Sequence, residues 1–117
     1  MDEYGNCAAI IPLTDNITTS QTWDTNRTLC KNTVIHSGVT LTITTATVFS
    51  ANHMITIESG GRLTMLGGII DDGHIVAQNG SELTIRNNGK VLLGNYDNFD
   101  IQLGAALNLE HGEISLK

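Results

Sequence analysis

A short phrase recurs four times along the chain, and it constrains the fold more than any other feature of the sequence. In each copy an apolar residue precedes a glycine by three positions, and two apolar residues separated by one polar residue follow it. The four glycines are Gly38, Gly60, Gly80 and Gly104. An alternating segment, a glycine corner and a second alternating segment are typical of two short β-strands joined by a tight turn.

The spacing of these glycines indicates how the copies are arranged in space. From 38 to 60, 60 to 80 and 80 to 104 the steps are 22, 20 and 24 residues. A repeat of this length, with strands on both sides of a glycine, predicts a coiled chain whose turns stack on one another. Stacked strands lie ~4.8 Å apart, so one internal ladder is expected to contain equivalent leucines. Its members are Leu41, Leu63, Leu83 and Leu107.

Residues 33–117 are therefore predicted to form about four coils of 20–24 residues, each with three short strands. We expect an all-β protein with the architecture of a parallel β-helix (β-solenoid). The chirality rule for parallel crossovers favours the right-handed form. With 117 residues and only 4% aromatic residues, the chain suits a single domain with an aliphatic core.

Residues 1–32 do not carry the repeat and are predicted to form an N-terminal cap. A stack of coils exposes an apolar cross-section at each end, which a terminal segment must cover. We expect Trp23, the only tryptophan, and Leu29 to pack on the first coil. The alternative is that Trp23 contacts a carbohydrate by stacking on a sugar ring.

The two cysteines, Cys7 and Cys30, lie within this N-terminal segment. A disulfide between them would close a loop of ~24 residues, which the chain-entropy model values at ~3 kcal/mol. Such a bridge persists only in an oxidising compartment. The alternative is a pair of buried thiols in a cytosolic protein.

Charge and hydropathy exclude two classes of partner. The net charge of −6 would bring like charges together on a phosphate backbone, so no nucleic-acid partner is expected. No stretch approaches the ~18 apolar residues of a membrane-spanning helix. No signal peptide is recognisable, so export would require that the signal has been removed.

The run from Ile17 to Ile43, ITTSQTWDTNRTLCKNTVIHSGVTLTI, resembles the opening of bacterial secreted proteins of the pectin-lyase-like, right-handed β-helix class. In that class a lead-in containing a tryptophan precedes a strand with this glycine pattern. The likeness covers roughly residues 17–117, and it implies an extracellular or cell-surface location. Members of the class include polysaccharide lyases and hydrolases, phage tailspikes, adhesins and coils that support other domains, so the fold alone does not select an activity.

One constellation of acidic residues is a candidate metal site. Asp71, Asp72, Asp97 and Asp100 occupy corners that precede the first strand of successive coils. Stacked carboxylates suit calcium, which takes 6–8 oxygen ligands, and His53 and His74 with a carboxylate would suit zinc instead. The simpler interpretation is turn chemistry, because Asp and Asn side chains satisfy backbone groups in tight corners.

A catalytic set cannot be assembled from the sequence. The basic residues Arg62 and Arg86 fall at or near glycine corners, where neither has an evident catalytic partner. Four coils also form a short wall, without the long loops that frame a sugar-binding groove. The expectation is a protein that is not an enzyme and needs no cofactor, calcium aside.

The last coil ends at Lys117 with no segment to cover it. Its unpaired strand edges are expected to be covered by further domains of a longer chain or by another copy of the protein, in end-to-end or lateral association. The function predicted from the sequence is thus a non-enzymatic structural or adhesive module of a secreted or cell-surface bacterial protein. The alternative is a carbohydrate-binding or carbohydrate-processing domain with a polysaccharide partner.

Overall fold

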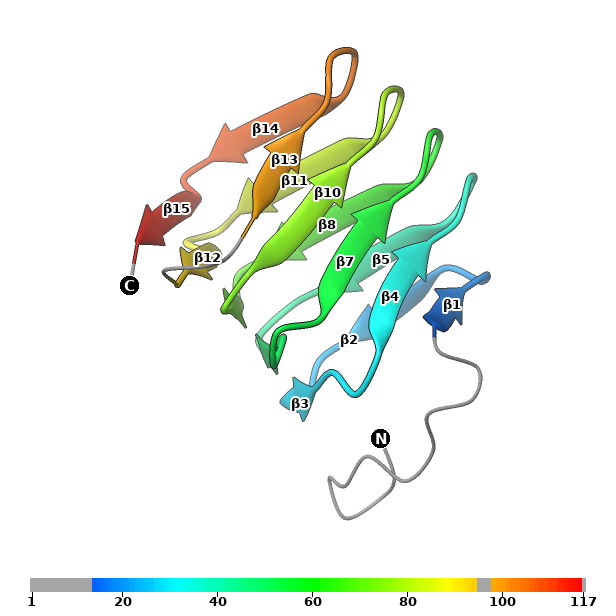
Figure 1. Ribbon diagram of the computed structural model, residues 1–117. Helices are drawn as coiled ribbons and strands as arrows, with labels where there is room; N and C mark the ends of the chain where they lie inside the picture. Colours follow the sequence, from blue (N-terminus) through cyan, green and yellow to red (C-terminus); the bar gives the residue numbers. More distant parts are fainter. Residues whose placement is uncertain (1–13, 95–97, 117) are drawn as a thin grey trace.

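The computed structural model describes residues 14–94 and 98–116, and their regular structure consists of strands alone (Figure 1). The strands form three parallel sheets of five strands each. Sheet A contains β1 (Thr14–Ile17), β4 (Asn32–Ile35), β7 (Met54–Ile57), β10 (His74–Ala77) and β13 (Phe99–Ile101). Sheet B contains β2 (Gln21–Trp23), β5 (Thr40–Ile43), β8 (Arg62–Leu66), β11 (Glu82–Arg86) and β14 (Ala106–Glu110). Sheet C contains β3 (Arg27–Thr28), β6 (Thr47–Phe49), β9 (Ile69–Asp71), β12 (Lys90–Leu93) and β15 (Glu113–Leu116).

Each sheet takes every third strand, so the chain visits all three sheets once before it returns to the first (Figure 1). We call each such set of three strands a lap, from lap 1 (β1–β3) to lap 5 (β13–β15). From the first strand of a sheet to the fifth, the backbone completes about four turns. The predicted parallel β-solenoid is confirmed.

The predicted leucine ladder lies in sheet B. Leu41 is aligned with Leu63, Leu63 with Leu83, and Leu83 with Leu107. The first three side chains are completely buried, whereas Leu107 is 37% exposed. Because strand side chains alternate between faces, this alignment follows from the polar residue between the two apolar ones in each copy of the phrase.

The four repeated glycines form a second ladder at the corner between sheets A and B. Each has a positive φ, between 80° and 89°. The amide of Gly38 donates to the carbonyl of Gly60, Gly60 donates to Gly80, and Gly80 donates to Gly104, at 3.0, 3.0 and 3.1 Å. Glycine suits these positions because a side chain would be strained at this φ.

The described part of the predicted cap, residues 14–32, supplies one strand to each sheet and therefore contains a lap of the solenoid. Trp23 and Leu29 are buried in the core, as expected, with 3% and 5% exposure. The aliphatic repeat does not reveal this lap, because Gln21 is aligned with Leu41 and Arg27 with Val48. Polar residues occupy positions that are apolar in the following laps.

Two side chains of lap 1 replace backbone acceptors at the beginnings of strands. Asn26 Oδ1 accepts a hydrogen bond from the amide of Thr47 at 2.8 Å, and Ser20 Oγ accepts one from the amide of Thr40 at 3.0 Å. At the same two positions of the next lap backbone carbonyls take this role: Val39 accepts from the amide of Arg62, and Ala46 accepts from the amide of Ile69. Specific side chains therefore help to hold lap 1 to lap 2.

Replacing Asn26 by alanine is expected to lower the free energy of unfolding by about 1 kcal/mol, because the Thr47 amide loses its protein acceptor. Urea denaturation followed by circular dichroism measures the change. Asn79→Ala is the matched control, since Asn79 is exposed at a glycine corner. An equal loss in both variants would contradict the assigned role of Asn26.

Candidate interaction surface at the C-terminal end

Five positions in each lap point into the solenoid, and we call these positions the inward ranks. In lap 4 they hold Ile75, Ala77, Leu83, Ile85 and Val91, all with 0% exposure. In lap 5 the aligned residues are Phe99, Ile101, Leu107, Leu109 and Ile114. All ten are apolar, but those of lap 5 have a neighbouring lap on one side only.

Lap 5 consequently exposes apolar surface at the C-terminal end of the solenoid. Leu107 is 37% exposed and Leu109 is 49% exposed, although Leu83 and Ile85, one lap below, have no exposed surface. Among residues 14–94 and 98–116, β13, β14 and β15 are each the last strand of their sheet, and no described strand pairs with their outer edges (Figure 1). Free backbone donors and acceptors beside an apolar face are the features by which a sheet edge binds another chain.

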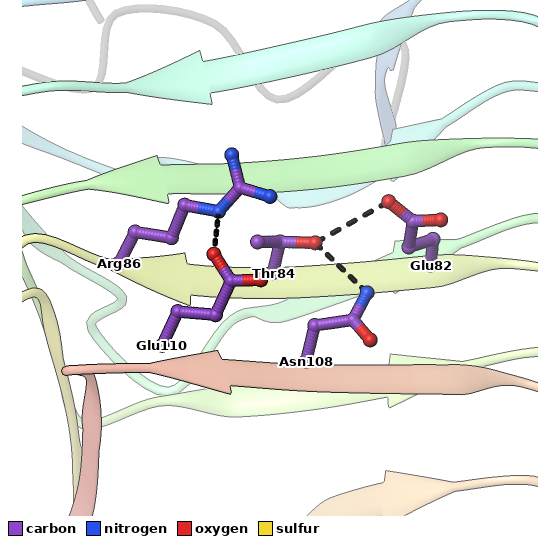
Figure 2. A network of polar contacts seen from close by, with 5 residues as sticks. All are labelled: Glu82, Thr84, Arg86, Asn108 and Glu110. Carbon is purple, nitrogen blue, oxygen red and sulfur yellow. Dashed lines mark hydrogen bonds and ion pairs between the residues drawn. The ribbon is translucent and has the colours of Figure 1, made fainter.

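A polar network on the outer face of sheet B holds β14 against β11 (Figure 2). Asn108 Nδ2 donates to Thr84 Oγ1 at 3.2 Å, and that hydroxyl donates to Glu82 Oε1 at 3.3 Å. Beside it, Arg86 Nε lies 2.6 Å from Glu110 Oε2. These contacts join the last two laps and keep the terminal strand in a defined register.

Thr84 and Asn108 are the polar residues between the two apolar ones in successive copies of the repeated phrase, but that pattern alone does not predict the network. The network could have been predicted from the aligned pairs Thr84–Asn108 and Arg86–Glu110. Residues at equivalent positions of neighbouring parallel strands lie side by side, so their side chains can interact. Outward pairs of complementary chemistry could have been found by writing the coils one above the other.

The N-terminal end differs in chemistry from the C-terminal end. Its inward ranks hold Asp15, Ile17, Gln21, Trp23 and Arg27. Three of these five are polar, whereas the five of lap 5 are all apolar.

The polar residues of lap 1 surround the indole of Trp23. Trp23 Nε1 donates to Gln21 Oε1 at 3.1 Å, and Arg27 Cζ lies 4.0 Å from the centroid of the indole ring. Desolvation by burial lowers the pKa of Arg27, while the carboxylates of Asp15 and Asp24 act in the opposite direction. The cation lies against an aromatic face, an arrangement that stabilises it.

Trp23 packs in the interior and is not placed to bind a carbohydrate. Only 3% of its surface is exposed, and the Arg27 guanidinium lies over the ring. A stacked sugar needs an open ring face. The structure therefore supports the packing interpretation of Trp23.

The predicted calcium residues are distributed over different elements. Asp71 is the last residue of β9 in sheet C, and Asp72 follows it in the corner with a φ of 57°. Asp100 lies on β13 in sheet A, aligned with Val76, and Asp97 is outside the described residues. Residues 14–94 and 98–116 contain no group of three or more His, Cys, Asp or Glu residues that could hold a metal ion.

Backbone and side-chain hydrogen bonds organise these corners. The amide of Ser50 donates to the carbonyl of Asp71 at 3.0 Å, which joins two successive corners. One lap further on, His74 Nδ1 accepts a hydrogen bond from the amide of Asn98 at 3.0 Å. This contact occupies one ring nitrogen of the histidine considered for zinc, and it fits the turn-chemistry interpretation.

The predicted disulfide has one partner outside the described residues. Cys7 belongs to residues 1–13, and Cys30 is half-buried immediately after Leu29. The bridge between Cys7 and Cys30 stays a prediction.

No family model, curated protein or solved structure matches the chain. Within the described residues, no helix has the length and apolar character needed to cross a membrane.

Proposed function

We propose that this chain is a rigid, non-enzymatic structural or adhesive module of a secreted or cell-surface protein, and that it self-associates through its C-terminal end. One observation carries the proposal: Leu107 and Leu109 are 37% and 49% exposed beside the free edge of β14. Monomeric proteins usually protect such an edge with charges, prolines or a covering segment.

Burial of the remaining exposed surface of Leu107 and Leu109 would favour association. Complete burial of a leucine side chain contributes about 1.5–3 kcal/mol, of which these partly exposed side chains have half or less left to gain, and backbone hydrogen bonds along the edge would add to it. The network of Thr84, Asn108, Arg86 and Glu110 holds β14 in place before a partner arrives. A preorganised edge loses less conformational entropy on binding than a mobile one.

The cellular context of the proposal comes from the likeness of residues 17–43 to the pectin-lyase-like, right-handed β-helix class. In that class, coils without chemistry of their own support neighbouring domains. By this likeness the chain belongs to a bacterial exported protein in which the solenoid holds other parts at a fixed separation. The stacked laps and the predicted Cys7–Cys30 bridge support this context.

The test is the state of association of a Leu109→Glu variant. A carboxylate at the apolar end should weaken association at least about tenfold, which corresponds to the loss of 1.4 kcal/mol or more. Sedimentation equilibrium over a wide range of protein concentration measures this change. Leu109 is half-exposed in the isolated chain, so the variant should keep the circular dichroism spectrum of the parent.

Phe49→Glu provides the matched control. Phe49 is 39% exposed on β6, on the outer face of sheet C and away from the end. The end-association proposal requires that this variant associates like the parent. A parent chain that stays monomeric at every concentration would contradict the proposal.

A further inference from the structure

The pattern Asn-x-Ser/Thr, a sequon, marks an acceptor for N-linked glycosylation and occurs three times in the chain. The asparagines are Asn16, Asn26 and Asn79, followed two residues later by Thr18, Thr28 and Ser81. We infer that Asn26 is a glycosylation site of the folded chain. The inference rests on the export of the chain in the proposed function, because the enzymes that attach such glycans act on exported chains.

The fold makes the other two sequons poor acceptors. Asn16 lies within β1, which pairs with β4 along its whole length. Asn79 is exposed in a corner, but Ser81, which supplies the hydroxyl of that sequon, has only 2% exposure. An enzyme that reads both the asparagine and the hydroxyl would have to open a strand pair in the first case and the corner in the second.

The sequon at Asn26 has neither obstacle. Asn26 lies in the corner between β2 and β3, outside both strands, and it is exposed. Arg27 points inward, over the indole of Trp23, so the next residue, Thr28, lies on the outer face of sheet C. Thr28 is half-buried and keeps part of its surface in solvent. The asparagine and the threonine are therefore both reached from outside the solenoid.

The hydrogen bond of Asn26 leaves the reacting atom available. Asn26 Oδ1 accepts from the amide of Thr47 at 2.8 Å, whereas glycosylation takes place at Nδ2. The donor is an oligosaccharide joined through its C1 atom to a lipid diphosphate. Nδ2 attacks C1, the C1–O bond to the diphosphate breaks with its electron pair on the diphosphate, and one Nδ2 proton passes to a base of the enzyme. The product keeps Oδ1 as an acceptor, so the contact between laps 1 and 2 is preserved.

A glycan at Asn26 would cover an exposed aromatic side chain. Phe49 is aligned with Thr28 and is 39% exposed on the outer face of sheet C. A bulky, hydrophilic glycan beside this ring would shield apolar surface from solvent and from other chains. Because Asn26 belongs to lap 1, the glycan leaves the apolar positions of lap 5 accessible for association.

Oligosaccharide transfer to the folded chain tests the inference. The full 117-residue chain is incubated with an N-oligosaccharyltransferase and a lipid diphosphate-linked oligosaccharide. The enzyme is one that glycosylates three synthetic peptides, each containing one of the three sequons, so that any difference between sites in the protein comes from the fold. Mass spectrometry of the intact chain counts the glycans, and mass spectrometry of its peptides locates them. We expect one glycan, at Asn26.

Thr28→Val provides the decisive variant. It removes the hydroxyl of the sequon and leaves Asn26 with its hydrogen bond to Thr47. We expect this variant to lose the added glycan mass while it keeps the circular dichroism spectrum of the parent. Thr18→Val and Ser81→Ala are the matched controls, because each removes the hydroxyl of another sequon. Both should be glycosylated like the parent.

The glycosylated chain should unfold at a urea concentration no lower than the unmodified chain, because Oδ1 still accepts from Thr47. A folded parent chain that receives no glycan, or receives equal amounts at Asn26 and Asn79, would overturn the inference. Sedimentation separates it from the proposed function. A chain that is glycosylated at Asn26 but monomeric would support the site and contradict self-association, whereas a self-associating chain without the glycan would do the reverse.

Discussion

Replacing Leu83 by alanine is expected to lower the free energy of unfolding by about 2–5 kcal/mol, the range for leucine truncation in a packed core. Leu83 has no exposed surface and lies between Leu63 and Leu107 in the leucine ladder of sheet B. The truncated side chain would leave a cavity that the two neighbouring laps cannot both fill. Chemical denaturation followed by circular dichroism measures the change. We expect the variant to unfold at a lower midpoint concentration of denaturant than the parent.

Leu107→Ala is the control for Leu83→Ala, because Leu107 occupies the same rank in lap 5. It is 37% exposed, so its truncation should cost much less than that of Leu83 at concentrations where the chain is monomeric. Equal losses at the two positions would show that lap 5 is covered in solution. Losses below about 1 kcal/mol at both positions would contradict the central place of this ladder in the core.

Gly68→Ala is expected to destabilise the chain by about 2–5 kcal/mol, from strain at positive φ together with overpacking. Gly68 has a φ of 76°. An added Cβ atom would lie 2.6 Å from the carbonyl oxygen of Ala46 and 2.8 Å from that of Thr44. Both oxygens belong to the backbone of the lap below, so relief of the contact would require two laps to separate locally. The thermal unfolding midpoint would fall accordingly.

Gly38→Ala separates these two contributions. Gly38 has a similar φ of 80°, but no atom lies within 4 Å of the position of an added Cβ. Its replacement should therefore cost only the backbone strain, about 1–2 kcal/mol. If Gly38→Ala and Gly68→Ala were equally destabilising, the close approach of laps at Gly68 would have no energetic importance.

The laps that carry the repeated phrase could be predicted because two simple signals coincide in them. Leu63 and Met65 alternate with polar residues, which specifies one inward face, and Gly60 marks the corner before them. Together they fix the register between neighbouring strands, and the structure confirms it for the whole leucine ladder.

Lap 1 could not be recognised from the same signals. Its inward ranks hold Asp15, Gln21 and Arg27, and no glycine marks its first corner. The physical reason is that Gln21 and Arg27 pack around the indole of Trp23, so polar side chains fill inward positions that are aliphatic in the other laps. A search for alternating apolar residues therefore does not find lap 1.

The candidate site was predictable in outline and not in detail. The apolar inward positions of lap 5 followed from the repeated phrase, but the chemical contrast with lap 1 required the register of β2 and β3. The acidic corners show the opposite case. Asp71 ends β9 in sheet C and Asp100 lies within β13 in sheet A, so the two residues do not occupy equivalent positions of successive laps.

The side-chain acceptors of lap 1 give the solenoid a place where it can open without global unfolding. The amides of Thr40 and Thr47 are bonded to Ser20 Oγ and Asn26 Oδ1, so both protons become accessible to solvent when lap 1 separates from lap 2. Each lap contacts only its neighbours, and laps 2 to 5 can stay folded during this event. Hydrogen–deuterium exchange at these two amides would therefore report local fraying between laps 1 and 2, well before the central laps exchange.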